Sequence, residues 1–210
     1  MAVLDRLFAT FYDRILAPSE VRGLAQMRED LVAPLDGVVV EVGAGTGLNL
    51  VHYPLDLDRL MLCEPTPEMV EHLEARVAEV GVDRPLEVVG APAEAIPMPD
   101  DSVDHVVSTL VLCTVDDLTR SVAEIARVLR PGGTLHLIEH IVAEPGRMRT
   151  VQTVIEPVWT VVARGCRLQR DPRTDLQEHG FHVSDLEEIS LPGGAGPVRR
   201  AIRGRASLVA

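Results

Sequence analysis

A run of β-branched residues that ends in closely spaced glycines is the feature that most restricts how this chain can fold. Residues Val38 to Val42 have the pattern of a buried strand, and Gly43, Gly45 and Gly47 follow directly. Glycines at the point where a strand passes into a helix keep the backbone free of side chains, so a ligand can approach the amide groups at the helix N-terminus. The sequence therefore predicts a strand, a ligand-binding loop and a helix, in this order.

The remaining chain alternates short Val-rich runs with longer segments of helical spacing, which is typical of an α/β fold with a mostly parallel sheet. Helices are predicted from about Thr66 and over residues 118–129. Further strands are predicted over residues 60–63, 86–89, 103–110, 134–139, 181–189 and 198–208. The Gly-rich turn before the last strand predicts a closing hairpin, which gives this seven-stranded sheet an antiparallel C-terminal edge.

The length and the lack of repeats predict a single domain over residues 1–210. Two helical segments lie outside the alternation of strands and helices. Residues 1–34 are predicted to form a helical cap over a cleft, with a first helix that ends near Pro18. Residues 143–175 are longer than an ordinary loop and are interpreted as a helical, substrate-binding insertion between strands five and six.

Acidic residues outnumber basic ones by 32 to 20, which gives a net charge of −12. This charge repels nucleic acid and anionic lipid and favours a small-molecule substrate. No apolar run reaches the length of a membrane span and no secretory leader is recognised, so we expect a cytoplasmic monomer or homodimer without integral membrane association. Every basic residue is Arg, which excludes chemistry that needs a lysine, such as a pyridoxal Schiff base or a Walker phosphate loop.

The cysteines and histidines show no metal-ligand spacing. Cys63, Cys113 and Cys166 are odd in number and far apart, so neither a disulfide framework nor a zinc site is predicted, and we interpret them as reduced thiols of the core or a pocket. Several histidines lack a partner at such spacing: His52, His72, His105, His136, His179 and His182. No metal ion is predicted, and a catechol-type magnesium site is not supported.

The glycine spacing and one acidic residue narrow the class of ligand. A dinucleotide site of the common kind needs G-x-G-x-x-G, but Leu48 occupies the position of the third glycine, which disfavours NAD and FAD. Glu64 ends the next predicted strand roughly twenty residues beyond the glycines, where a carboxylate accepts hydrogen bonds from both hydroxyls of a ribose. A ribose-containing ligand other than a dinucleotide fits this pattern.

From Val38 to Leu208 the order of these motifs resembles a class I methyltransferase of the ubiquinone-biosynthesis-like group. The resemblance implies a Rossmann-like sheet with helices on both faces, S-adenosyl-L-methionine as cofactor and S-adenosyl-L-homocysteine as product. It also implies that Glu41 orders the glycine loop and the methionyl end of the cofactor, that Pro65 and Met69 flank the adenine, and that Asn49 adds a polar contact.

The string from Ala93 to Asp104 resembles the block of this family whose first residues read the adenine amino group. Pro92 replaces the usual Asp of that block. We therefore expect Ala93 or Glu94 to take over this contact, with weaker adenine recognition as the consequence.

A narrower resemblance, to the methyltransferase-like 7 group of thiol methyltransferases, rests on further strings. These are Thr109 to Val115, Arg127 to Gly133, Glu139-His140, Glu156 to Trp159 and Gly165-Cys166. The animal members carry an N-terminal membrane anchor that is not expected in this chain, and similar strings occur in bacterial proteins assigned to lipid or quinone methylation. Thr109 and Leu110 complete the predicted cofactor-binding set.

Methyl transfer from a sulfonium is an in-line displacement, so the protein must mainly hold acceptor and methyl carbon collinear in a dry pocket. His140, at the end of the fifth predicted strand, is the candidate general base, with a structural histidine as the alternative. Glu139 is predicted to orient His140 or to bind the methionyl amine, with a capping role as the alternative. Tyr12 and Trp159 are candidate acceptor-pocket residues, although core packing also explains them.

The favoured function is methylation of a small, rather apolar thiol, because a thiol with a pKa of about 8.5 needs little help to ionise at neutral pH. O-, N- or C-methylation of a secondary metabolite, quinone or phospholipid is the first alternative. A cofactor-binding protein without catalysis is the second. The glycine spacing disfavours a nicotinamide oxidoreductase on the same kind of sheet.

Overall fold

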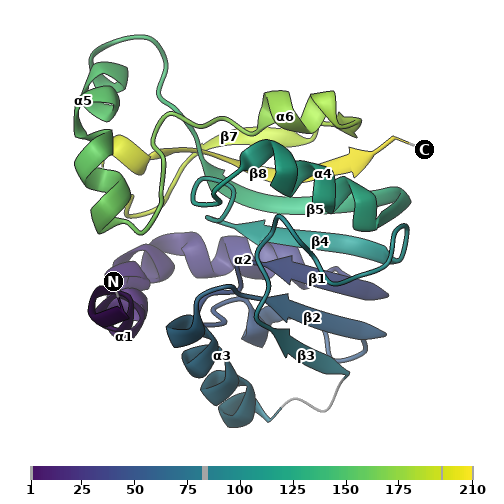
Figure 1. The fold of residues 1–210 in the computed structure, drawn as a ribbon. Helices are drawn as coiled ribbons and strands as arrows, with labels where there is room; N and C mark the ends of the chain where they lie inside the picture. The colour runs from purple at the N-terminus through teal and green to yellow at the C-terminus, as the bar shows by residue number, and fades with distance from the viewer. Residues whose placement is uncertain (1, 82–84, 195, 210) are drawn as a thin grey trace.

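The computed structural model describes residues 2–81, 85–194 and 196–209, and within them eight strands form one sheet (Figure 1). The strands run in the order β3-β2-β1-β4-β5-β8-β6, and β7 also pairs with β8. Neighbours among β1 to β5 are parallel, whereas β8 is antiparallel to β5, β6 and β7. The bounds are β1 Val38–Val42, β2 Arg59–Cys63, β3 Leu86–Val89, β4 Val103–Thr109, β5 Leu129–His140, β6 Phe181–His182, β7 Leu186–Ser190 and β8 Arg200–Leu208. The predicted fold class is confirmed.

Helices precede and connect these strands. They are α1 Ala2–Ser19, the π-helix η1 Glu20–Leu24, α2 Ala25–Val32, the 3-10 helix η2 Leu50–His52, α3 Pro67–Val80, α4 Leu118–Val128, α5 Arg147–Val162, α6 Arg173–Glu178 and the 3-10 helix η3 Gly196–Val198. α3 starts with Pro67, whose missing N–H does no harm in a first turn, and ends at Gly81, whose φ of 62° suits a helix C-cap. No helix in the described ranges is long and apolar enough to cross a membrane.

Alternate residues of the central strands face two apolar layers. Val40 packs in one cluster with Ile125 of α4, and Val39 packs in another with Val32 of α2 and Leu73 of α3. Each buried side chain of this size stabilises the fold by ~1.5–3 kcal/mol. Because helices cover both faces, the strands appear in the sequence as continuous apolar runs.

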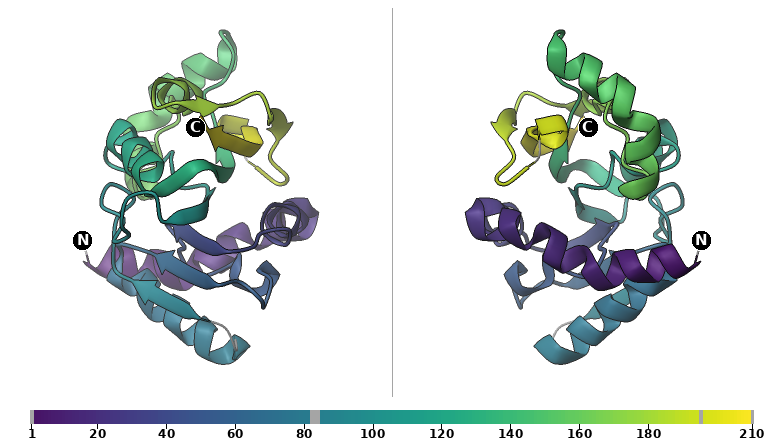
Figure 2. Two further views of the ribbon diagram at one scale, coloured as in Figure 1. Left: turned by 90° about the vertical axis from the view of Figure 1, so that its right-hand side faces the viewer. Right: turned by 90° about the vertical axis from the view of Figure 1, so that its left-hand side faces the viewer.

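The parallel strands end at one edge of the sheet, and α1 and α5 lie beyond that edge (Figure 1, Figure 2). The strand order reverses between β1 and β4, which are neighbours although β2 and β3 separate them in the sequence. In open α/β sheets, ligands bind in the crevice that such a reversal opens at the carboxyl ends of the strands. The glycine loop after β1, Glu64 after β2 and His140 at the end of β5 all lie at this edge.

The prediction of a helix directly after the glycine loop is wrong. The described residues that follow Gly47 form turns and the short helix η2, and Tyr53 then becomes extended with a ψ of 142°. Pro54 explains this end, because the residue before a proline is disfavoured in the helical region. Asn49 and Tyr53 instead direct their side chains to Glu41.

Two predicted strands differ from the structure by more than two residues or in their continuity. β5 starts at Leu129 rather than at residue 134, because α4 ends before Pro131 and the chain extends at once. The strand predicted over residues 181–189 is divided into β6 and β7. The turn between them brings the Asp185 carbonyl against Gly204 of β8, where a Cβ atom would lie 2.2 Å from that oxygen.

Candidate active site

The glycine loop is packed tightly at Gly43 and Gly47 and less closely at Gly45. A Cβ atom at Gly43 would lie 2.5 Å from the Val111 side chain, and one at Gly47 would lie 2.7 Å from Leu73. At Gly45 the nearest atom would be in the Tyr12 ring, at 3.8 Å. Gly43 and Gly47 therefore let the loop pack closely, whereas Gly45 has only ordinary van der Waals contact with the Tyr12 ring of α1.

Glu64 joins the tip of β2 to the glycine loop. Its Oε2 accepts a hydrogen bond from the Gly45 amide at 3.0 Å, and its Oε1 accepts one from the Thr66 amide at 2.8 Å. The side chain is buried at the carboxyl edge of the sheet. A carboxylate oriented by two backbone amides at this place can also accept hydrogen bonds from the hydroxyls of a ribose.

Glu41 lies at the centre of a buried polar network. Its Oε1 accepts from Asn49 Nδ2 at 2.8 Å and its Oε2 from the Tyr53 hydroxyl at 2.9 Å. Asn49 Nδ2 also lies 3.1 Å from Thr109 Oγ1, which ties the turn after the glycine loop to β4. Burial raises the pKa of Glu41 to about 7, against the opposing effect of the hydrogen bonds from Tyr53 and Asn49.

Arg28 of α2 is the residue of this site that sequence reasoning missed. Its Nη1 donates to Asn49 Oδ1 at 2.9 Å and its Nε donates to Glu20 Oε1 at 3.1 Å. The side chain is buried and lines a hollow together with the glycine loop, Glu41 and Thr109. In the sequence Arg28 is an ordinary polar residue of a short helix, and it belongs to no recognised motif.

α1 closes over the glycine loop. Tyr12 lines the same hollow, and burial raises the pKa of its phenol to about 12. The Asp13 carboxylate accepts hydrogen bonds from Thr46 Oγ1 at 2.5 Å and from the Arg76 guanidinium of α3. The hollow that is left has a volume of about 10 Å³, which is room for roughly one water molecule.

α1 ends beside Pro18, as the sequence predicts. The helix continues to Ser19, and the chain bends a few residues later at Gly23, which has a φ of 126°. This bend turns the chain from α1 at the carboxyl edge into α2, which packs on one face of the sheet.

The other predicted cofactor residues lie around the same crevice in different environments. Met69 of α3 and Ala93 are buried, whereas Pro65 is exposed. Glu94 Oε1 accepts a hydrogen bond from the Asp117 amide at 3.0 Å, so its carboxylate lies at the start of α4. Leu110 follows β4 with a φ of 61°, a left-handed conformation that turns the chain away from the sheet.

Glu139 holds the loop after β4. Its Oε1 accepts hydrogen bonds from Ser108 Oγ at 2.8 Å, from the Val111 amide at 2.8 Å and from the Leu112 amide at 2.9 Å. Burial raises its pKa. Among the described residues its Oε2 has no hydrogen-bond partner, and it makes no hydrogen bond to His140. The structure thus places this carboxylate on the loop backbone rather than on the imidazole that it is predicted to orient.

His140 meets two cysteines from distant parts of the chain. Its Nε2 lies 2.9 Å from Cys166 Sγ, and Trp159 Nε1 donates to the same sulfur at 3.2 Å. Ligand atoms of Cys113, His140 and Cys166 all lie within 4.8 Å of one another. The hydrogen bond from Cys113, with those from His140 and Trp159, lowers the pKa of Cys166, while that of Cys113 is raised. Within the described residues, His140 Nδ1 has no partner.

Tyr12 and Trp159, both predicted in one acceptor pocket, belong to different surroundings. Tyr12 lines the hollow at the glycine loop and contacts Phe8, with ring centroids 5.4 Å apart. Trp159 of α5 packs against a small cluster formed by Cys113, Cys166 and Leu168.

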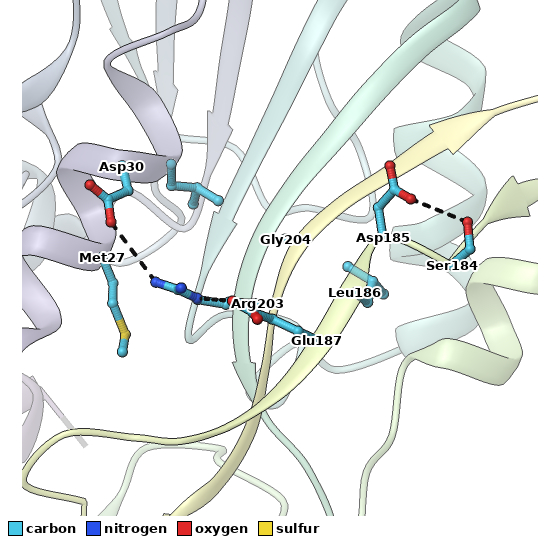
Figure 3. Close-up of a pocket in the computed structure, with 9 residues that line it drawn as sticks. Met27, Asp30, Ser184, Asp185, Leu186, Glu187, Arg203 and Gly204 are labelled. Atoms are coloured by element: carbon cyan, nitrogen blue, oxygen red, sulfur yellow. Dashed lines mark hydrogen bonds and ion pairs between the residues drawn. The ribbon is translucent and has the colours of Figure 1, made fainter.

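Figure 3 shows a larger hollow of about 360 Å³ elsewhere in the molecule, between α2, β7 and β8. Its Arg203 is paired with Glu187 of β7 and with Asp30 of α2, the latter at 3.9 Å. It shares no lining residue with the hollow at the glycine loop. The candidate active site is therefore the crevice at the strand ends.

A parallel sheet, a glycine loop and an acidic residue at the end of the next strand define the class of nucleoside-binding α/β enzymes. A family model described as a methyltransferase domain matches residues 40–137. Human thiol S-methyltransferase TMT1A is 34% identical over 95% of this chain and 82% of its own length, and a phosphatidylethanolamine N-methyltransferase of Cereibacter sphaeroides is 31% identical over 68% of this chain and 72% of its own. A solved SAM-dependent methyltransferase from Thermotoga maritima superimposes with a TM-score of 0.67 at 21% identity, covering 98% of this chain and 97% of the other.

The chain belongs to the methyltransferase family that includes the TMT1 thiol S-methyltransferases. It is a methyltransferase enzyme, and its cofactor is S-adenosyl-L-methionine. The family resemblance and the cofactor predicted from the sequence are both confirmed.

Proposed function

We propose that this enzyme transfers a methyl group from S-adenosylmethionine to the sulfur of a small, apolar thiol. The observation that carries the proposal is the similarity to TMT1A, which extends over 95% of the chain and so includes both the glycine loop and the segment with Trp159 and Cys166. A second candidate is N-methylation of a lipid amine, favoured by the similarity to the phosphatidylethanolamine N-methyltransferase over 68% of the chain.

The residues at the crevice fit the cofactor. Because Gly45 has no side chain, a ligand can approach its backbone closely, and the amide-oriented carboxylate of Glu64 suits a ribose diol. The buried guanidinium of Arg28 suits the methionyl carboxylate, and Glu41 orders the loop below it. Met69 is proposed to pack against the adenine.

Less direct roles are proposed for the other predicted cofactor residues. Pro65 is proposed to border the adenine together with Met69, and Ala93 to meet its amino edge through the backbone. Thr109 keeps Asn49 in place by its hydrogen bond. Leu110 turns the chain at the end of β4 and so shapes the crevice wall.

Residues 1–34 are proposed to act as a cap that opens for the cofactor. The hollow of about 10 Å³ beneath α1 leaves no room for the methionyl end of the cofactor beside Gly45, so we expect α1 to move outward when the cofactor binds. The contacts that must break are those of Asp13 with Thr46 and Arg76. Once closed again, α1 would exclude water from the reacting atoms, as an in-line displacement requires.

S-adenosylmethionine supplies an electrophilic methyl group on a positively charged sulfur. The acceptor thiol loses its proton, its sulfur forms the new S–CH₃ bond, and the bond from the methyl carbon to the sulfonium sulfur breaks. Since a thiol is partly ionised at neutral pH, the chain mainly has to orient the acceptor and keep water away. The base role of His140 stays a prediction, because its Nε2 faces Cys166.

The test is transfer of labelled methyl groups by the purified protein to a panel of alkyl and aryl thiols, phenols, amines and phosphatidylethanolamine vesicles. We expect transfer to thiols, lost in Glu64→Ala and kept in Glu71→Ala, which changes an exposed glutamate of α3. Transfer to amines or oxygen acceptors alone would overturn the thiol assignment. Cofactor binding without transfer to any acceptor would support a non-catalytic protein.

We further propose that the enzyme is a cytoplasmic monomer or homodimer that does not bind nucleic acid. All three cysteines are free thiols, the state that a reducing compartment maintains. The net charge of −12 opposes binding to phosphate backbones. Cell fractionation, light scattering and a nucleic-acid binding assay at low salt test these three points.

A further inference from the structure

Three buried side chains with metal-binding donors meet at the acceptor end of the crevice. Cys113 comes from the loop after β4, His140 from the end of β5 and Cys166 from the segment after α5. All three are buried, with 3% exposure for Cys113 and His140 and 7% for Cys166. Their ligand atoms lie within 4.8 Å of one another, although 26 or more residues separate them in the sequence.

We propose that this Cys–His–Cys cluster, formed by Cys113, His140 and Cys166, binds a zinc ion. Two thiolates and one imidazole are soft and borderline ligands, which select Zn²⁺ over the hard ions Mg²⁺ and Ca²⁺. Two thiolates also balance the charge of a divalent cation, so the buried site is neutral with the metal in place.

The geometry needs only a small adjustment to accept the ion. With Zn–S at about 2.3 Å and Zn–N at about 2.0–2.1 Å in a tetrahedral site, ligand nitrogen and sulfur lie about 3.5 Å apart. His140 Nε2 and Cys166 Sγ lie 2.9 Å apart without the ion, so they must separate by roughly 0.6 Å. The two sulfur ligands of such a site lie about 3.8 Å apart, which is within the 4.8 Å bound on the separations in this cluster.

The backbone around the cluster fixes the two cysteines relative to each other. The Arg167 amide donates to the Cys113 carbonyl at 2.8 Å. Gly165 has a φ of 98°, and a Cβ atom there would lie 2.9 Å from the Thr114 carbonyl oxygen, so only glycine lets the two segments approach this closely. Trp159 donates to Cys166 Sγ, and thiolate ligands commonly accept such a second hydrogen bond.

Two buried polar atoms beside the cluster are unpaired within the part of the chain that the structure describes. Among the described residues, His140 Nδ1 and the neighbouring Glu139 Oε2 lack hydrogen-bond partners. Buried polar groups are nearly always satisfied, because leaving one unpaired costs about 1–3 kcal/mol. Neither atom is a ligand of the proposed ion, since His140 binds it through Nε2 and keeps Nδ1 as a donor for a further acceptor group.

Three protein ligands leave the fourth tetrahedral position open, which is the arrangement of catalytic rather than structural zinc sites. We assign that position to the acceptor thiol, and this assignment rests on the proposed function. The cluster lies next to the cofactor loop, because Val111, two residues before Cys113, packs on Gly43. A zinc ion held there would release the thiol proton to solvent. The thiolate sulfur would then form the bond to the methyl carbon as the bond from that carbon to the sulfonium sulfur breaks, which leaves S-adenosylhomocysteine and a neutral thioether that dissociates.

The experiment measures metal binding separately from activity. Full-length protein, freed of any affinity tag, is analysed for zinc and then loaded with Co²⁺ after chelation. We expect about one metal ion per chain and a thiolate-to-cobalt charge-transfer band in the near ultraviolet. Cys113→Ala, Cys166→Ala and His140→Gln should each lower the affinity for Zn²⁺ roughly 100-fold or more.

Two control variants keep this test decisive. Cys63→Ala removes a buried thiol of β2 outside the cluster, and Trp159→Phe removes the N–H donor without removing a ligand, so both should keep the charge-transfer band. Folding of each variant is checked by circular dichroism. If the folded wild-type protein binds neither Zn²⁺ nor Co²⁺ at micromolar concentrations of the metal, the zinc site is overturned. The three side chains would then form only a hydrogen-bonded thiol–imidazole cluster.

The outcomes for the site and for the proposed function can be told apart. Metal binding without thiol methylation would keep the site and reject the thiol acceptor. Thiol methylation that is unchanged in the metal-free enzyme would keep the function and reject the acceptor as fourth ligand. Loss of methylation on chelation, restored by Zn²⁺ alone, is the result that we expect.

Discussion

The cofactor end and the acceptor end of the same crevice differ in how completely their polar groups are paired. At the cofactor end, both carboxylate oxygens of Glu64 and both of Glu41 accept hydrogen bonds. At the acceptor end, described residues leave Glu139 Oε2 and His140 Nδ1 without a partner. The protein itself pairs these carboxylate oxygens at the cofactor end, whereas two buried polar atoms stay unpaired among the described residues of the acceptor end.

We relate this difference to what each end must bind. A fixed cofactor is held best by donors and acceptors that are already oriented, because little entropy is then lost on binding. A site for an exchanging acceptor needs polar groups that are still free to pair with that acceptor. The predictions that follow test each end by changes that leave the other intact.

The largest expected effect is the pH dependence of stability that Glu41 creates. Burial raises its pKa in the folded state from 4.5 to about 7, so the folded protein favours the protonated acid. The resulting stabilisation is fully present below about pH 4.5 and is lost as the pH rises through about 7, to a total of roughly 3 kcal/mol. Urea unfolding of wild type and Glu41→Gln from pH 5 to 8 measures it.

We expect a smaller loss of stability with rising pH in Glu41→Gln than in the wild type over this range. An equal pH slope in the two proteins would show that Tyr53 and Asn49 keep the carboxylate ionised. Glu87→Gln, on an exposed side chain of β3, is the matched control and should leave the slope unchanged.

The next prediction compares Gly43, which packs against Val111, with Gly45, which has no such close neighbour among the described residues. Gly43 and Gly45 share a φ of 58°, so alanine causes the same backbone strain at either position. Only at Gly43 would the new methyl group clash, at 2.5 Å from Val111. The free energy of unfolding of Gly43→Ala should therefore be ~1–3 kcal/mol lower than that of Gly45→Ala. Equal stabilities of the two variants would contradict the packing role of Gly43.

A third prediction concerns Arg28. It distinguishes binding of the amino-acid part of the cofactor from binding of its adenosine part. Arg28→Met should weaken binding of S-adenosylhomocysteine by ~1.5–2 kcal/mol, since it removes a charge-assisted hydrogen bond to the amino-acid carboxylate. Adenosine lacks that carboxylate, so its affinity should change little. Calorimetry with both ligands measures the difference, and equal losses for the two would place Arg28 outside the contact with the ligand.

The smallest effect is expected at the acceptor end. Trp159→Phe keeps an aromatic ring in the cluster with Cys166 and Leu168 but removes the N–H that donates to Cys166. We expect the KM for a thiol to rise about 5-fold, or ~1 kcal/mol, with unchanged affinity for S-adenosylhomocysteine. A change in cofactor affinity of the same size would show that the two ends are coupled rather than separate.

The features that could be predicted from sequence are those that neighbouring residues create. The apolar run before Gly43 and the position of Glu64 after the next strand predicted a mostly parallel sheet and a ribose-containing ligand, because strand periodicity and turn chemistry are local. The resemblance of the motifs to a family then implied the cofactor. The helix expected after Gly47 failed because Pro54 and the side-chain bonds of Asn49 and Tyr53 outweigh the motif. Arg28 was missed since its burial depends on how α2 packs against the sheet.

The sequence by itself determined the fold class, the family and the cofactor-binding edge, since these follow from periodicity and from motifs within a few residues. Only the tertiary structure decided that Cys113, His140 and Cys166 lie together, that Glu139 holds a loop backbone, and that Asp13 fastens α1 over the glycine loop. The physical reason is that contacts between residues far apart in the sequence are set by the packing of whole strands and helices, which no local pattern records.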